Sequence, residues 1–183
     1  MITKAEWKKI RGSLPNPDQI MLSIKGDAAH QMTVRWRTDL TVENGYALYR
    51  KAGTENWEKA DAFIHTIHTD MDDSNLFFAD MTGLDAGCEY EYTCGNDEFR
   101  SDVFKFKTPK ENLDKFSFLC VSDVQAGDAE PPADYSVLNS VLKKILSDHP
   151  ECDFILTAGD NTNCGQTDIQ WTGLFEGLKG IIE

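Results

Sequence analysis

In the stretch Met32-Thr33-Val34-Arg35-Trp36-Arg37-Thr38, the apolar residues Met32, Val34 and Trp36 alternate with the polar residues Thr33, Arg35 and Arg37. A period of two places the apolar side chains on one face of an extended strand and the polar ones on the other. Shorter runs of the same kind recur between Gln19 and about Lys107, and Gly, Asp or Asn residues bound each of them. These further runs cover residues 46–49, 63–68, 76–81, 88–94 and 103–107. About seven short strands at this spacing predict an antiparallel β-sandwich.

Aromatic residues at alternating positions of these runs have two interpretations. Trp36, Tyr90 and Tyr92 could form a surface on which a ligand stacks, or they could fill the core of the sandwich. Alternation in a sandwich favours the core, because one face of each strand is buried.

The pattern changes after the segment 108–112, Thr-Pro-Lys-Glu-Asn, which we interpret as a domain boundary. Residues 116–121 are almost continuously apolar, which is typical of a strand buried on both faces, and Cys120 within them is expected in the core. Residues 154–158 form a second run of this type, and an apolar pattern between 169 and 181 predicts a helix. Between the two runs, Asp134 can cap a helix whose apolar face holds Val137, Leu138, Val141, Leu142, Ile145 and Leu146.

The order strand, helix, strand, helix predicts the start of an α/β domain with a parallel sheet. We therefore expect a helical lead-in over residues 1–18, an all-β sandwich over 19–109 and a partial α/β domain over 114–183. Within the lead-in, Thr3 and Glu6 have the spacing of a capping box, which predicts a short helix to about Ile10.

Composition narrows the classes of partner and compartment. The 183 residues carry a net charge of -13 with a pI near 4.6, which argues against binding to a nucleic-acid backbone or an anionic membrane. No apolar stretch is long enough to cross a bilayer, and the N-terminus has no apolar signal segment. The five cysteines form an odd set without a CxxC pair, so we expect no disulfide framework, a reducing compartment and a cytoplasmic location.

Two carboxylates follow the two apolar runs of the C-terminal part. Asp123 comes just after the first run and Asp160 just after the second. Open α/β sheets bind ligands at the carboxyl ends of their strands, and carboxylates there suit divalent metal ions. Gln125 and Asn163 could add amide oxygens. The alternative is that both aspartates are ordinary loop or helix-cap residues.

These motifs and the domain before them resemble known families. The order Ser122-Asp123-x-Gln125, a helix, then Ala158-Gly159-Asp160-x-x-Asn163 resembles the calcineurin-like metallophosphoesterases. The preceding part resembles the fibronectin type III-like N-terminal domain of purple acid phosphatases, through residues 32–38 and 81–92. Together the resemblance extends from about residue 19 to the end.

The resemblance implies a binuclear metal site that hydrolyses phosphate esters with a metal-activated hydroxide, using Mn, Zn, Fe or Mg. It makes Asp123 a terminal ligand of one ion and Asp160 the ligand shared by both. Gln125 stands where the family usually has His. Asn163 stands where purple acid phosphatases have the metal-binding Tyr, so the iron-tyrosinate centre is not expected here.

The resemblance also implies ligands that this sequence lacks. The family continues with a Gly-Asn-His-Asp/Glu motif and a Gly-His-x-His motif, which include the catalytic His, and neither occurs before Glu183. We therefore interpret the chain as a truncated fragment that is inactive by itself and associates through residues 116–183. The alternative is a non-catalytic interaction module with a vestigial phosphoesterase part.

Two other groups of residues could suggest metal sites. Asp70, Asp72 and Asp73 loosely resemble a calcium loop, but Asn75 stands where the EF-hand has Gly, so we expect a solvated hairpin turn. His65 and His68 should point to opposite faces of a strand. Structural roles are expected for all four histidines: His30, His65, His68 and His149.

Overall fold

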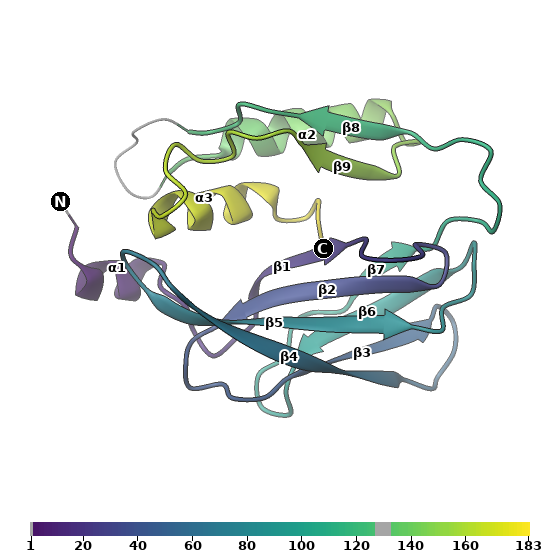
Figure 1. The fold of residues 1–183 in the computed structure, drawn as a ribbon, viewed down its shortest axis with the longest axis horizontal. Coiled ribbons are helices and arrows are strands. Elements are labelled where there is room, and N and C mark those ends of the chain that lie inside the picture. Colours follow the sequence, from purple (N-terminus) through teal and green to yellow (C-terminus); the bar gives the residue numbers. More distant parts are fainter. Residues whose placement is uncertain (1, 127–132) are drawn as a thin grey trace. The chain divides into compact units, whose positions relative to one another are not determined.

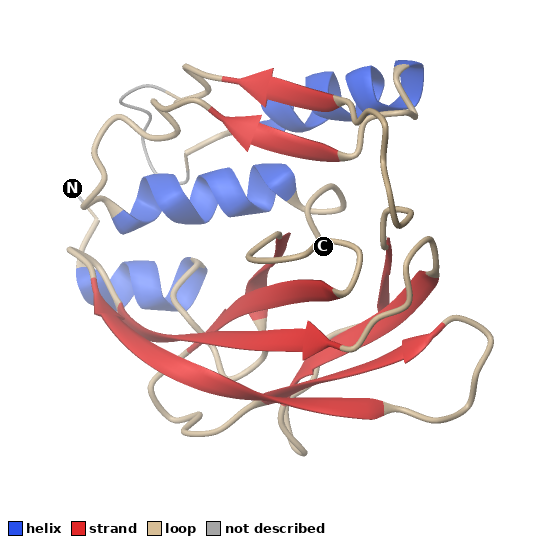
Figure 2. Ribbon diagram, turned by 45° about the vertical axis from the view of Figure 1, so that its right-hand side comes forward, coloured by secondary structure: helices blue, strands red, loops and turns tan. Residues whose placement is uncertain are grey.

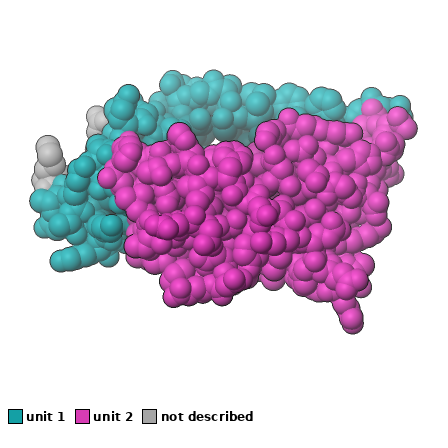
Figure 3. All heavy atoms as spheres, turned by 60° about the horizontal axis from the view of Figure 1, so that its bottom comes forward, with its two compact units in different colours: residues 1–12, 69–72, 114–182 teal, residues 13–68, 73–113, 183 magenta. Residues whose placement is uncertain are grey.

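The structure is a computed structural model, and it describes residues 2–126 and 133–183. The chain divides into two compact units (Figure 3). One unit, here called the sandwich unit, holds residues 13–68, 73–113 and 183. The other, here called the helical unit, holds residues 1–12, 69–72 and 114–182. The boundaries expected from the sequence remain a prediction.

The sandwich unit contains seven antiparallel strands, as the alternation predicted (Figures 1 and 2). They lie in the order β1-β2-β5-β4-β3-β6-β7. Their bounds are β1 (Asp18–Ser23), β2 (Gln31–Thr38), β3 (Tyr46–Lys51), β4 (Glu58–His68), β5 (Asp73–Thr82), β6 (Glu89–Gly95) and β7 (Phe104–Lys107).

The long strand β4 joins two sheets. Tyr46 to Tyr49 of β3 pair with residues 58–61 of β4, whereas residues 62–68 of β4 pair with β5. One sheet therefore holds β1, β2, β5 and the second part of β4, and the other holds the first part of β4 with β3, β6 and β7. This arrangement confirms the predicted β-sandwich.

The apolar residues of β2 face the core. Val34 and Trp36 are fully buried, and the Trp36 ring stacks on Phe77 with 5.2 Å between ring centroids. Tyr90 and Tyr92 are buried in the same cluster, so the core interpretation of these aromatics is confirmed.

Arg37 departs from the simple alternation. It lies on the polar side of β2, yet it is only 1% exposed. Its Nε and Nη2 donate hydrogen bonds of 2.8 and 2.7 Å to the two carboxylate oxygens of Asp18. This bidentate pair lets a guanidinium be buried, since its charge and donors are matched.

The helical unit begins with α1 (Lys4–Ile10), whose capping box between Thr3 and Glu6 is confirmed. Further along the chain come β8 (Phe118–Val121), α2 (Ser136–Asp148), β9 (Phe154–Thr157) and α3 (Asp168–Leu178). β8 and β9 pair in parallel with Phe118 opposite Phe154, so the predicted order of elements and the parallel pairing are confirmed.

Burial of the first apolar run on both faces was a wrong prediction. Phe116 is 60% exposed, Phe118 is 47% exposed, and Cys120 on the same face is exposed as well. Among the described residues, β8 pairs only with β9, and this face of the pair is open to solvent. A continuous apolar run indicates that both faces of a strand could be buried, but it does not indicate whether other elements cover those faces.

The predicted cap and face of α2 also need correction. The N-cap is Tyr135, and Asp134 instead accepts a 2.8 Å hydrogen bond from the backbone N–H of Ser136. Of the six apolar residues predicted on its inner face, only Leu142 is fully buried, and Val137 is 75% exposed.

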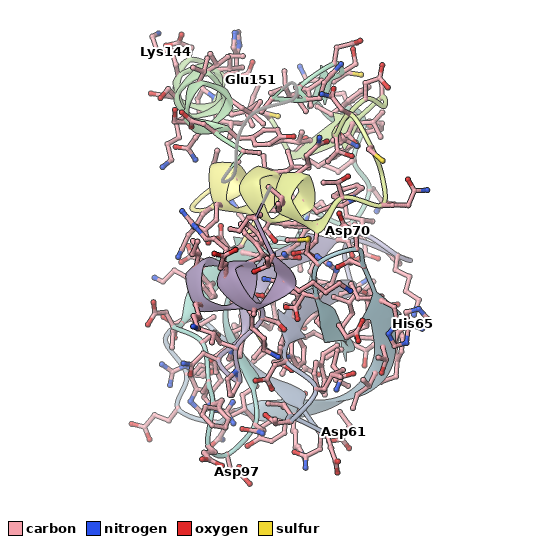
Figure 4. The ribbon with its side chains drawn as sticks, turned by 90° about the vertical axis from the view of Figure 1, so that its left-hand side faces the viewer. Asp61, His65, Asp70, Asp97, Lys144 and Glu151 are labelled. Carbon is pink, nitrogen blue, oxygen red and sulfur yellow. The ribbon has the colours of Figure 1, made fainter. Side chains whose placement is uncertain are left out.

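The turn between β4 and β5 is not the simple solvated turn that we expected. Asp72 is buried, and Asp70 Oδ1 accepts a 2.8 Å hydrogen bond from the backbone N–H of Asp168 at the start of α3. Figure 4 shows Asp70 beside that helix. The carboxylate supplies a partner for one of the N–H groups that the first turn of a helix leaves unpaired.

No helix in the described part of the chain is both long enough and apolar enough to span a membrane.

Candidate metal centre

Asp123 and Asp160 lie two and three residues beyond β8 and β9, at the carboxyl ends of these strands. Because the strands are parallel and pair in register up to Val121 and Thr157, both aspartates come to the same edge. Both are exposed, and both have left-handed backbone conformations, with φ of 56° and 48°. Non-glycine residues seldom adopt such angles, and those that do cluster at functional sites.

Residues 122–126 follow β8 and are here called the first turn, and residues 158–163 follow β9 and are called the second turn. Backbone hydrogen bonds connect the two turns. The N–H of Asp123 donates to the carbonyl of Gly159 at 3.3 Å, and the N–H of Gln125 donates to the carbonyl of Asp160 at 3.2 Å. The hydroxyl of Ser122 donates to Asp123 Oδ2 at 2.6 Å. The first turn and the second are therefore one connected structure.

Two side chains of the first turn pack against a small core. Val124 and Ala126 pack against a cluster formed by Ala133, Tyr135 and Leu174. Gln125 lies between them, and its Oε1 is buried with no hydrogen-bond partner among the described residues. Buried oxygens of this type normally accept a hydrogen bond or coordinate a cation.

The second turn contains a matching atom. Asn161 Oδ1 is also buried and has no partner within the described part of the chain. The backbone carbonyl of the same residue accepts a 3.0 Å hydrogen bond from the hydroxyl of Tyr135. Burial raises the pKa of Tyr135, and a hydrogen bond from the backbone of Ala126 acts in the opposite direction.

Two glycines of α3 determine where Tyr135 stands. A Cβ atom at Gly177 would lie 2.3 Å from Tyr135 Cβ, and one at Gly173 would lie 2.5 Å from the carbonyl oxygen of Ala133. Gly173 and Gly177 are four residues apart and so share one helix face. Their lack of side chains lets the segment that carries Tyr135 approach the helix backbone.

The predicted ligands thus fall into two groups. Asp123, Gln125 and Asp160 are in the connected turns, and Asn163 is exposed farther along the second turn. Asn161 was not among the predicted ligands, although it directly follows Asp160. Tyr135 was not predicted either, because no local motif marks it.

The donor set fits part of a metal site. Carboxylate and amide oxygens are the ligands that hard divalent ions take. Within residues 2–126 and 133–183, however, no group of three or more His, Cys, Asp or Glu side chains is placed to hold an ion. The histidines lie elsewhere: three are in the sandwich unit, where Figure 4 shows His65, and His149 is the C-cap of α2.

Comparisons with known proteins cover the sandwich unit by family and most of the chain by fold. Residues 17–108 match the family described as "Purple acid Phosphatase, N-terminal domain". Among solved structures, purple acid phosphatase PPD1 from seeds of yellow lupin (Lupinus luteus) matches with a TM-score of 0.73 and 17% identity. The match covers 91% of this chain and 33% of the lupin chain, so this chain spans about a third of that enzyme's length. At this identity the likeness is one of fold.

Two further structures match more weakly and carry no argument. A redesigned β-sandwich protein has a TM-score of 0.36 and 14% identity, over 53% of this chain and 97% of that one. The sensor domain of the anti-sigma factor RsgI4 in Pseudobacteroides cellulosolvens has a TM-score of 0.34 and 16% identity, over 51% of this chain and 98% of that one. None of the curated proteins matches this sequence. The family match covers half of the chain, and on that ground the chain belongs to the family of the purple acid phosphatase N-terminal domain.

Proposed function

We propose that this chain is the N-terminal part of a binuclear metal-dependent phosphoesterase that hydrolyses phosphate esters. One observation carries the proposal: two carboxylates, Asp123 and Asp160, stand on left-handed turns at the carboxyl ends of paired parallel strands. Family membership of residues 17–108 supports it from an independent part of the chain.

Each residue of the two turns then has a role. Asp123 and Asp160 would hold the metal ions, and the amide oxygens of Gln125 and Asn163 would be further ligands. When bound, ions such as Mn, Zn, Fe or Mg activate a water molecule and neutralise charge on the phosphoryl oxygens. The protein's own contribution is positional: Ser122 orients the Asp123 carboxylate, and the backbone bonds between the turns fix the two carboxylates relative to each other.

The remaining ligands and the histidine that assists the leaving group would come from residues outside this sequence. The chain by itself should therefore hydrolyse p-nitrophenyl phosphate no faster than the Asp123→Asn and Asp160→Asn variants do. Turnover that survives repurification and disappears in both variants would instead show that these 183 residues already form a catalytic site.

Metal binding by the chain tests the proposal directly. Isothermal titration with Mn²⁺ should show weak binding to the wild type and weaker binding to Asp123→Asn and Asp160→Asn. Asp114→Asn is the matched control, because it removes the same charge from an exposed position of the helical unit outside the turns. Equal Mn²⁺ affinity in all four proteins would contradict the site and favour the interaction-module alternative.

A further inference from the structure

The side chain of Tyr135 contacts both turns of the candidate centre. Its ring packs in the cluster that holds Val124 and Ala126 of the first turn. Its hydroxyl donates to the carbonyl of Asn161 in the second turn at 3.0 Å. Tyr135 therefore meets the first turn through its ring and the second turn through its hydroxyl.

The hydroxyl has a role that packing alone does not explain. Tyr135 is almost fully buried, and phenylalanine would fill the same apolar space. A buried phenol usually finds a hydrogen-bond partner, and here the partner is the carbonyl of Asn161 in the second turn. The backbone carbonyl it binds belongs to the residue directly after Asp160.

Two glycines of α3 allow the segment that carries Tyr135 to lie close to this helix. Gly173 and Gly177 leave room for the backbone of residues 133–135, where any side chain would collide. Leu174 packs on the ring from the same helix. Packing against α3 therefore fixes the position of the Tyr135 ring. The position of the ring determines where the hydroxyl lies relative to the two turns.

We propose that Tyr135 is a positioning residue that locks the two turns together: its ring packs against the Asp123–Ala126 turn, and its hydroxyl holds the Asp160–Asn161 turn. This lock sets the separation of the two carboxylates and the direction of the buried amide oxygen of Asn161. The consequence for metal binding rests on the proposed function, whereas the mechanical lock stands without it.

Tyr135→Phe is the test, with Tyr49→Phe as the matched control. Tyr49 is also a buried tyrosine whose hydroxyl donates to a backbone carbonyl, that of Thr82 at 2.9 Å, but it lies in the sandwich unit. Hydrogen exchange at single residues, measured without metal, reports on the lock. The informative amides are those of Asp123 and Gln125, because both donate across the two turns.

Loss of one net hydrogen bond should speed exchange at these amides about five-fold in Tyr135→Phe and leave it unchanged in Tyr49→Phe. The N–H of Ala158, which donates to Val121 within the strand pair, should be unaffected in both. Unchanged exchange at Asp123 and Gln125 in a folded Tyr135→Phe protein would overturn the proposal. If the variant does not fold, low protection of the same two amides in the wild type would overturn it equally.

Titration with Mn²⁺ shows whether the contact made by Tyr135 affects metal binding or only the local structure of the turns. Removing a residue that orients metal ligands typically lowers metal affinity by about ten-fold or more. We expect that loss in Tyr135→Phe and none in Tyr49→Phe. Faster exchange with unchanged Mn²⁺ affinity would reject the positioning role. A wild type that binds no Mn²⁺ would reject the proposed function, and the exchange data would still decide whether the lock exists.

Discussion

The indole N–H of Trp7 donates a 2.7 Å hydrogen bond to Oδ2 of Asp168, joining α1 to a helix 161 residues later in the chain. Both residues are buried. Asp168 is the first residue of α3, and its own N–H is bound by Asp70, so segments 1–12 and 69–72 are both tied to the same helix start. The helical unit is therefore assembled from three separate stretches of sequence around the N-terminus of α3.

Replacement of Trp7 by Phe should destabilise the helical unit. The substitution keeps an aromatic ring but leaves the buried Asp168 carboxylate without its 2.7 Å donor. Loss of a hydrogen bond to a charged group costs about 2 kcal/mol of the free energy of unfolding. Urea unfolding followed by circular dichroism measures this change. Trp57→Phe is the control, since Trp57 is half-buried beneath Arg50 in the sandwich unit, and it should change stability by less than about 0.5 kcal/mol.

A methyl group at position 177 should be poorly tolerated. In Gly177→Ala the new Cβ would lie 2.3 Å from Tyr135 Cβ, so helix and segment must move apart. Alanine favours helices over glycine by about 1 kcal/mol, and a lower melting temperature in spite of this gain would demonstrate the clash. Gly165→Ala is the control, because a Cβ there meets no atom within 4 Å. An equal or higher melting temperature for Gly177→Ala would show that the contact with Tyr135 is loose.

Local patterns in the sequence predicted local structure well. The Thr3–Glu6 capping box and the strands of the sandwich depend on neighbours a few residues apart, and both are confirmed. Burial in β2 does not alternate as the sequence does, because Thr33, Arg37 and Thr38 on its polar side or at its end are buried too. The two aspartates were also found locally, because each follows an apolar run directly. Whether they bind metal remains a prediction.

Contacts between distant segments could not be read from the sequence. Asp70 was expected in a solvated turn because nothing near it in the chain indicates that it binds the start of α3. The role of Tyr135 could not be predicted for the same reason, since its hydrogen-bond partner Asn161 is 26 residues away in the chain. The exposure of Phe118 was missed for a related reason: an apolar strand does not reveal how many layers will cover it.

Iron bound to the candidate centre should be colourless in the visible range. The resemblance to purple acid phosphatases implies that Asn163 stands where those enzymes have their metal-binding Tyr. Tyr135 uses its hydroxyl to bind the Asn161 carbonyl. Burial also raises the pKa of Tyr135, which disfavours the phenolate that a ferric ion would need. Absorption spectra of the chain titrated with ferric iron test this expectation. A charge-transfer band that disappears in Tyr135→Phe would show that this tyrosine reaches the metal after all.

The open face of the β8–β9 pair should make the chain self-associate. Phe118 stacks on Phe154 with ring centroids 5.2 Å apart, and Phe116 lies 5.8 Å from the same ring. Leu156 and Cys120 continue this face, which carries no charged side chain in these strands. A pair of strands with one apolar face open to solvent is marginally stable by itself.

A second copy of the chain is the occupant that we expect on this face. Two identical uncharged faces can meet across a two-fold axis, so the net charge of -13 does not oppose contact locally. Size-exclusion chromatography with light scattering should therefore find a dimer or larger species at high micromolar concentration. Phe118→Lys should shift the population to monomer, because association would bury a charge without a partner.

Phe63→Lys is the control for this last prediction. Phe63 is likewise exposed and stacks on Phe78 at 4.9 Å, but it belongs to the sandwich unit. It should leave the oligomeric state unchanged, because we expect association through residues 116–183 alone. A wild-type chain that stays monomeric would refute self-association, and loss of the dimer in Phe63→Lys but not in Phe118→Lys would place the interface on the sandwich instead.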